Sequence, residues 1–191
     1  MKKTFKNTAL VFIIILLSSF TIPNINKSSS NALFNTVEWM TFEEAIAAAK
    51  ADKEAGKTPK KMFVDVYTDW CGWCKVMDEK TFQVPMVAKY LNENFYPVKF
   101  NAEQKEDLIY KGKTLKFVKS GRRGYHELAS GLLNGKMSYP SVVFLDEDAD
   151  IITTASGYIK VDRFDVIMRY IGDNHYKDKT WEVFQSEYKA E

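Results

Sequence analysis

Two neighbouring segments read Met62-Phe63-Val64-Asp65-Val66-Tyr67 and Trp70-Cys71-Gly72-Trp73-Cys74, and the second holds the only two cysteines of the 191-residue chain. Two sulfurs at this spacing can join where the chain turns back on itself, as it does in the first turn of a helix. The free N–H groups and the positive dipole end there favour thiolate, so we expect Cys71 to be the nucleophile. Cys74 is then the resolving thiol, which attacks a mixed disulfide on Cys71. This chemistry requires Cys71 to be exposed and within bonding distance of Cys74.

The cysteine pair has two other interpretations, both weaker. A structural zinc site usually needs four ligands, but the chain has no third cysteine and its two histidines, His126 and His175, lie far along the sequence. A purely structural disulfide across so short a loop would remove very little entropy from the unfolded chain. We therefore favour redox chemistry without a metal or cofactor, and interpret both histidines as ordinary surface or packing residues.

A second motif, Ser138-Tyr139-Pro140-Ser141, stands directly before the apolar run Val142-Val143-Phe144-Leu145. With the cysteine motif and its preceding strand, it makes the chain resemble the thioredoxin-like proteins over roughly residues 36–172. The resemblance implies an α/β fold, a central mixed β-sheet flanked by helices. It also implies that Pro140 is cis and faces the cysteines, whereas a lone proline here would be an ordinary trans residue at the start of a strand.

The match to the family has one clear departure, because Trp73 stands where thioredoxin itself has proline. The redox potential and partners of thioredoxin therefore do not transfer. The tryptophan, the following Lys75 and the lead-in 39–45 look more like an exported thioredoxin-related subfamily. Members of that subfamily mostly act as reductants that receive their electrons from a membrane electron donor.

Asp65 occupies the position of the acid that thioredoxins bury beneath the second cysteine. The resemblance implies that its carboxyl group has a raised pKa and takes the proton of Cys74 through a water molecule. The alternative is a strand-end aspartate that faces solvent. Since Val64 and Val66 point to the opposite face, Asp65 is buried only if both faces of its strand are covered.

Four residues near the cysteines are candidates for substrate binding: Trp70, Trp73, Tyr139 and Pro140. The tryptophans offer apolar surface to a polypeptide, although Trp70 could equally serve for packing. Tyr139 and Pro140 would present a strand-like edge to the backbone of the partner.

The first 30 residues form a separate segment. Three lysines precede the apolar run 9–17, which is typical of a signal peptide and short for a membrane span. We expect an export signal, hence a periplasmic or other extracytoplasmic protein; an uncleaved membrane anchor is the alternative. A polar linker follows, and the thioredoxin-like domain is expected over 31–191, with a helical extension at 173–191.

The net charge of the chain bears on the kind of partner it can bind. The chain has a formal charge of +2, which becomes −2 without residues 1–30, because they hold four lysines and no acids. Global charge thus gives no support to a nucleic-acid partner. A local basic stretch, the lysines of 111–119 with Arg122 and Arg123, is expected to be solvated surface.

The remaining elements follow from periodicity, caps and turns. Thr41 and Glu44 predict a capping box at the start of a helix, and Pro85 predicts a kink or a new helix. Segments 108–110 and 114–118 around Gly112 predict a β-hairpin insertion before the third core helix, within 105–124, more suited to covering the sheet than to binding a partner. Further elements are expected at 62–67 and 95–101 (strands), 71–79 and 124–133 (helices), 141–146 and 151–155 (a hairpin), and from 161 onward (helices).

The sequence therefore predicts an exported thiol-disulfide oxidoreductase that acts on protein thiols or disulfides through Cys71, as a reductase, with a disulfide oxidase or isomerase as the alternative. The alternative from another class is a binding module that uses the proline edge and the hairpin, with incidental cysteines.

Overall fold

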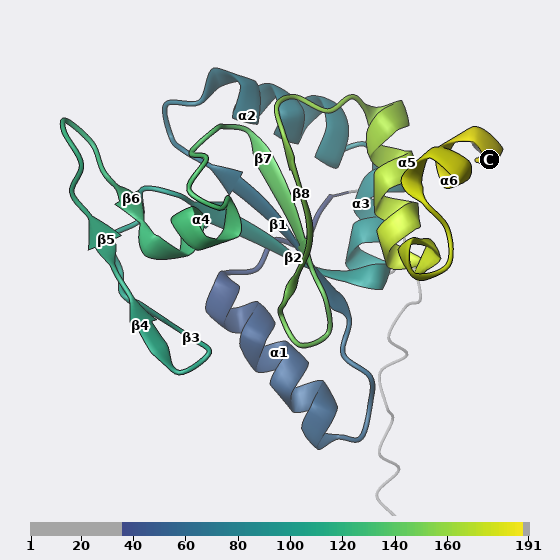
Figure 1. The fold of residues 1–191 in the computed structure, drawn as a ribbon, viewed down its shortest axis with the longest axis horizontal. Coiled ribbons are helices and arrows are strands. Elements are labelled where there is room, and N and C mark those ends of the chain that lie inside the picture. The colour runs from purple at the N-terminus through teal and green to yellow at the C-terminus, as the bar shows by residue number, and fades with distance from the viewer. Residues whose placement is uncertain (1–35, 189–191) are drawn as a thin grey trace, which may run out of the picture.

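A four-stranded mixed sheet forms the centre of the molecule (Figure 1). The computed structural model describes residues 36–188, so the predicted signal or anchor segment lies outside the described residues. Strand β1 runs parallel to β2 and antiparallel to β7, and β8 pairs with β7 at the far edge. The central sheet is thus confirmed, with the strands β1 (Lys61–Tyr67), β2 (Phe95–Asn101), β7 (Ser141–Leu145) and β8 (Ile151–Ser156).

Helices cover both faces of this sheet. The central strand β1 therefore buries side chains on either side. Val64 and Val66 belong to one core and Phe63 to the other, as the alternation of a strand requires. The rings of Phe63 and Phe164 pack edge to face with centroids 5.4 Å apart. The first face is covered by α1 (Phe42–Glu54) and α4 (Glu127–Leu132), and the second by α2 (Gly72–Met77), the π-helical turn η1 (Asp78–Phe82), α3 (Pro85–Asn94) and α5 (Val161–Gly172).

Local chemistry explains where the helices begin. Thr41 Oγ1 accepts a hydrogen bond from the N–H of Glu44, and Glu44 Oε2 accepts one from the N–H of Thr41, so the predicted capping box is present. Pro85 stands in the first turn of α3, where its missing N–H costs nothing, and marks a new helix. The helix that carries the cysteines changes to π-helical geometry at Asp78.

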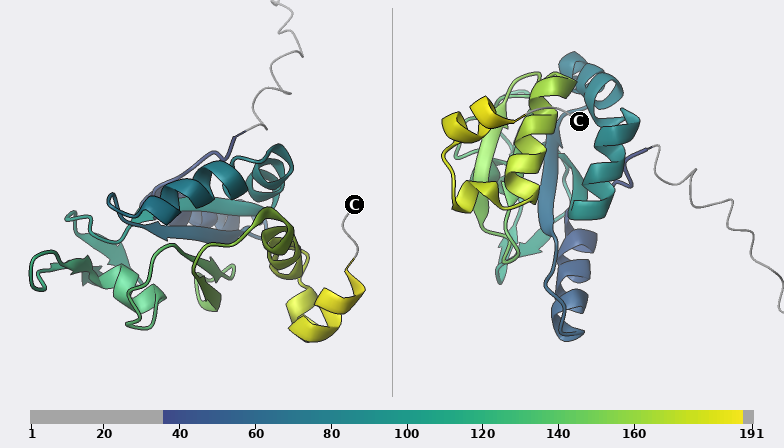
Figure 2. Two further views of the ribbon diagram at one scale, coloured as in Figure 1. Left: turned by 90° about the horizontal axis from the view of Figure 1, so that it is seen from above. Right: turned by 90° about the vertical axis from the view of Figure 1, so that its right-hand side faces the viewer.

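The insertion between β2 and α4 contains two hairpins. The predicted one pairs β3 (Leu108–Tyr110) with β4 (Lys113–Leu115), and a second pairs β5 (Phe117–Val118) with β6 (Tyr125–His126). Figures 1 and 2 show both hairpins at the end of the molecule opposite to the C-terminal helices.

Two expectations about the insertion are wrong. Segment 114–118 is not one strand, because the backbone of Lys116 leaves the ladder to bond Glu127, through the Glu127 carboxylate and the Glu127 N–H. The helix expected from Gly124 begins at Glu127 instead. His126 caps it, since its Nδ1 accepts from the N–H of Leu128 at 3.1 Å, and this holds the preceding residues extended.

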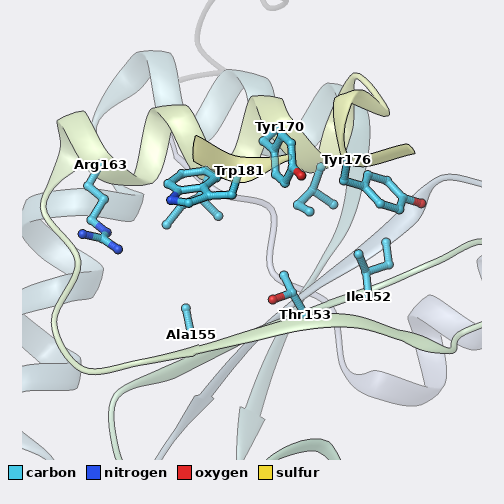
Figure 3. A pocket seen from close by; sticks show the side chains of 9 residues that line it. Ile152, Thr153, Ala155, Arg163, Tyr170, Tyr176 and Trp181 are labelled. Atoms are coloured by element: carbon cyan, nitrogen blue, oxygen red, sulfur yellow. The ribbon is translucent and has the colours of Figure 1, made fainter. Parts of the chain in front are cut away.

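The C-terminal part packs beside the edge strand β8. After α5 come a 3₁₀ turn, η2 (His175–Lys177), and α6 (Trp181–Glu187). A groove of about 360 Å³ lies between β8 and these helices, and Figure 3 shows Tyr170, Tyr176 and Trp181 lining it from the helical side. None of its lining residues belongs to the cysteine motif. No helix within residues 36–188 is long and apolar enough to cross a bilayer.

Candidate active site

Cys71 and Cys74 are joined by a disulfide that closes the first turn of α2, with their Cα atoms 5.3 Å apart. Cys71 is the N-cap of this helix, and its Sγ accepts a hydrogen bond from the N–H of Cys74 at 3.1 Å. An amide directed at this sulfur stabilises negative charge on it once the disulfide is reduced. The structure thus confirms the expected bonding distance and the expected place at a helix start.

The expectation that Cys71 is exposed is wrong for this oxidised structure. Cys71 and Cys74 are each only 4% exposed, whereas Trp70 and Trp73 beside them are 51% and 62% exposed. In the closed disulfide the two sulfurs are bonded to each other, and the two exposed rings flank the pair in the sequence. A partner must therefore approach between aromatic side chains to reach the sulfur of Cys71.

Two aromatic pairs flank the disulfide. Trp70 packs edge to face on Tyr139 with ring centroids 5.9 Å apart, and Trp73 packs on Tyr158 at 5.5 Å. The Tyr139–Pro140 peptide bond is cis, as expected from the sequence. The structure therefore brings together the cysteine motif and the proline turn, through the contact of Trp70 with Tyr139. The role of these residues in substrate binding stays a prediction.

Asp65 lies on the face of β1 that α2 covers, because it is two residues beyond Phe63 in the strand. It is 1% exposed, so the predicted burial is confirmed and the solvent-facing alternative is wrong. Its Oδ2 is 2.9 Å from Nζ of Lys99 on β2, and the same Nζ is 3.1 Å from Oδ1 of Asp78 in η1. Lys99 thus forms ion pairs with two carboxylates.

This arrangement sets unusual pKa values. Burial raises the pKa of Asp65 to about 6, although the nearby charge of Lys99 acts in the opposite direction. Burial also opposes the charge of Lys99, but Asp65 and Asp78 outweigh it and raise the pKa of that lysine. Asp65 therefore changes charge close to neutral pH while Lys99 stays protonated.

A cavity of about 310 Å³ connects the ion-pair cluster to the cysteine motif. Cys74, Lys99 and Asp78 all line it, together with Tyr67, Thr68, Asp69 and Lys75. Asp65 does not line this cavity but contacts Lys99, which does. The sequence reasoning missed Lys99 as the partner of Asp65, although a single lysine in the apolar strand 95–100 is a readable signal.

Trp70 has two further partners, which come from the insertion. Its Nε1 donates to Oε1 of Glu103 at 2.9 Å, and the guanidinium of Arg123 lies 4.0 Å from the centre of its ring. Sequence reasoning did not find these contacts, because both join segments distant in the chain and that of Arg123 depends on the unpredicted β5–β6 hairpin. Trp70, the residue before Cys71, is thus held between the proline turn and the insertion.

The two histidines lie apart from this site. His126 is fully buried, packs edge to face on Phe100 and has its Nε2 3.1 Å from the carbonyl oxygen of Glu106. Burial lowers its pKa. His175 stacks on Phe184 at 4.6 Å near the C-terminus. Both are packing residues.

The fold and the site define a class: a thioredoxin-fold protein with a disulfide-forming Cys-X-X-Cys pair at a helix start, beside a cis-proline turn. Residues 25–179 match the model of the Thioredox_DsbH family, described as a protein of unknown function, DUF255. The match covers most of the sequence, and the chain belongs to this family.

Solved structures show the same fold. A thioredoxin-fold protein from Helicobacter pylori is 21% identical, with 67% of this chain and 79% of that chain covered and a TM-score of 0.51. A structure called DsbH oxidoreductase is 16% identical, with 74% and 88% covered and the same score. A thioredoxin from Thermus thermophilus is 19% identical, with 71% and 87% covered, again at 0.51.

Curated relatives match over shorter stretches. Spermatogenesis-associated protein 20 of mouse is 34% identical over 88 residues, which are 44% of this chain and 10% of that protein. The human protein of that name is 31% identical over 75 residues, 39% of this chain and 9% of that protein. This chain therefore spans about a tenth of the length of the curated relatives it matches.

Proposed function

We propose that this chain is an exported thiol-disulfide oxidoreductase that reduces disulfides of other proteins through Cys71. The observation that carries the proposal is the Cys71–Cys74 disulfide at the start of α2, with an amide N–H directed at the sulfur of Cys71. A pair in this geometry can pass between dithiol and disulfide with little movement of the backbone. The fold shared with a DsbH oxidoreductase is consistent with this chemistry.

The reaction has two exchange steps. The thiolate of Cys71 attacks one sulfur of a partner disulfide, which forms a mixed disulfide and releases one partner thiolate. Cys74 then loses its proton and attacks the sulfur of Cys71, which releases the second partner thiolate. Two electrons pass to the partner, and the Cys71–Cys74 disulfide remains. A second dithiol must reduce it again, and we assign this step to a membrane electron donor.

Asp65 is the base we propose for the proton of Cys74. Its pKa of about 6 means that it is largely ionised at neutral pH yet close enough to that pH to hold a proton briefly. The cavity shared by Cys74 and Lys99 is large enough for the bridging water that this transfer needs.

Trp70, Trp73, Tyr139 and Pro140 form the surface we propose for the partner polypeptide. The exposed tryptophans offer apolar area, and the carbonyl of Tyr139, next to the cis bond, lies in the edge that can pair with an extended backbone. Since Cys71 is buried, binding must part at least one aromatic pair before the sulfurs meet.

An insulin reduction assay tests the enzymatic proposal. Cys71→Ser should abolish turnover, and Cys74→Ser should accumulate mixed disulfides with substrates, which mass spectrometry identifies. Undiminished activity of the Cys71→Ser protein would contradict the proposal. The reduction potential of the pair tests the direction, because a value near about −270 mV supports a reductant and one near about −120 mV an oxidant.

The burial of both cysteines favours one competing function, a binding module whose disulfide stays closed. One measurement distinguishes the two functions: the rate at which a dithiol reduces the Cys71–Cys74 bond in the folded protein. A binding module resists reduction until it unfolds, whereas an oxidoreductase is reduced and reoxidised repeatedly in its native state. The location is tested separately, by cell fractionation and by sequencing the N-terminus of the mature protein.

A further inference from the structure

The insertion contains a hollow of about 440 Å³ beside Trp70. Its lining comes from the segment directly after β2 and from the β5–β6 hairpin with its loop. The hollow is lined by Glu103, Lys105, Phe117, Lys119, Arg122, Arg123 and Gly124. Four of these seven residues carry cations: Lys105, Lys119, Arg122 and Arg123. The single acid, Glu103, already accepts a hydrogen bond from Trp70.

The cations of the hollow differ from two other lysines of the insertion. Lys111 pairs with Asp150, and Lys116 pairs with Asp107 at 3.3 Å. Within residues 36–188, by contrast, no carboxylate lies within ion-pair distance of the four cations that line the hollow. The basic stretch is therefore not uniformly solvated surface: part of it is neutralised, and the rest concentrates positive charge in one place.

The hollow is continuous with the redox site. Arg123 lines it and also stacks on the ring of Trp70, the residue directly before Cys71. On its other side, Trp70 contacts Tyr139 of the proline turn. A polypeptide that occupies the proline edge beside Cys71 would therefore meet the four cations a few residues further along.

The shape of the loop is fixed rather than free. Gly124 has a φ of +149°, and a Cβ there would lie 2.6 Å from the carbonyl oxygen of Val118 and overlap the ring of Phe117. Only glycine allows the two sides of the β5–β6 hairpin to approach so closely. The cations of the intervening loop are thereby held on the side of Trp70.

We propose that this hollow is the docking site for an acidic segment of the polypeptide substrate, next to the disulfide that is reduced. The inference rests on the proposed function and adds the substrate class: proteins with glutamate or aspartate close to the target cysteine. Charge complementarity and continuity with Trp70 favour this occupant over an anionic membrane surface. It also assigns the insertion to partner recognition, where the sequence favoured covering of the sheet.

Direct binding tests the inference without redox chemistry. Two cysteine-free peptides are compared on the oxidised full chain, one with four glutamates and one with four glutamines in their place. The acidic peptide should bind roughly fivefold to tenfold more tightly at low salt, the range that a few exposed charge pairs produce, and the difference should fade at high salt. The double variant Lys119→Gln/Arg122→Gln should lose most of this preference. Lys113→Gln, an exposed lysine of the same insertion outside the hollow, should keep it.

A measurement of turnover distinguishes failure of the docking site from failure of the proposed redox function. The same two sequences, each now with an internal disulfide, are reduced by the dithiol form of the protein, and the ratio of the two rate constants is compared with the ratio of affinities. Equal affinities for both peptides overturn the docking site, even if both are reduced rapidly. Tight binding of the acidic peptide without any reduction overturns the redox function and leaves the docking site in place. Binding of anionic phosphatidylglycerol vesicles through Lys119 and Arg122, with no peptide preference, also overturns it.

Discussion

Asp65 and Lys99 are register partners across the parallel strands β1 and β2, and their Oδ2 and Nζ atoms are 2.9 Å apart. In spite of this ion pair, burial holds the pKa of Asp65 at about 6, above its ordinary value of 3.8. The desolvation of the carboxylate therefore outweighs its attraction to the lysine. Two consequences follow, one for stability and one for proton transfer.

Asp65→Asn should stabilise the oxidised protein at pH 7.5. The folded protein holds the Asp65 proton more tightly than the unfolded chain, so Asp65 disfavours folding increasingly as pH rises from about 4 to about 6. A shift of about two pKa units corresponds to about 3 kcal/mol, and this figure already includes the attraction to Lys99, which opposes the effect of burial. Urea unfolding at pH 4 and pH 7.5 measures this. The two proteins should be closest in stability at pH 4, and a variant less stable at pH 7.5 would contradict the burial argument.

Lys99→Met should move the pH profile of the resolving step to higher pH. The lysine lowers the pKa of Asp65, so without it the carboxyl keeps its proton over a wider range and cannot accept one from Cys74. An opposite charge at this distance typically shifts a pKa by about one to three units. The measurement is the rate at which Cys74 resolves a mixed disulfide on Cys71, as a function of pH. Lys89→Met, which removes an exposed lysine beside Glu93 on α3, is the control and should leave the profile unchanged.

Much of the site could be predicted from sequence because its signals are local. The spacing of Cys71 and Cys74, the proline after Tyr139 and the capping box at Thr41 each depend on residues a few positions apart. The burial of Asp65 needed one further inference, that its strand is central. The cis state of Pro140 and the buried acid at Asp65 came from the resemblance to the thioredoxin-like proteins and not from spacing alone.

The missed features depend on contacts between distant segments. Lys99 reaches Asp65 only through the register of two parallel strands, which no local pattern reveals. Arg123 reaches Trp70 only because two strands of two residues each pair across a loop, and strands that short show no alternation. The exposure of Cys71 was misjudged because the place of a residue at the start of a helix does not determine how far the rest of the fold buries it.

Trp73→Ala should have opposite effects on the access of a small reductant to the disulfide and on the recognition of a protein substrate. Without the ring that packs on Tyr158, a small reductant such as dithiothreitol should reduce the Cys71–Cys74 disulfide faster than in the unaltered protein. A protein substrate should instead react about tenfold more slowly, because one aromatic contact of roughly 1.4 kcal/mol is lost. Trp181→Ala, a comparable deletion in the groove beside β8, is the control and should alter neither rate. Equal slowing with dithiothreitol and with the protein substrate would mean that Trp73 shapes the helix rather than the access to the disulfide.

Gly124→Ala should destabilise the insertion and weaken the preference for acidic peptides together. A Cβ at this positive φ would strain the backbone and strike Val118 and the ring of Phe117, so the hairpin must open, at a cost of about 2 to 4 kcal/mol. Gly121→Ala is the matched control in the same loop: its φ is also positive, but open space surrounds it, so it should cost only about 1 kcal/mol. Urea unfolding gives the stabilities, and peptide binding at a temperature where both variants are folded gives the preference. If Gly124→Ala lost stability yet kept the acidic preference, the β5–β6 hairpin would not be what positions the cations beside Trp70.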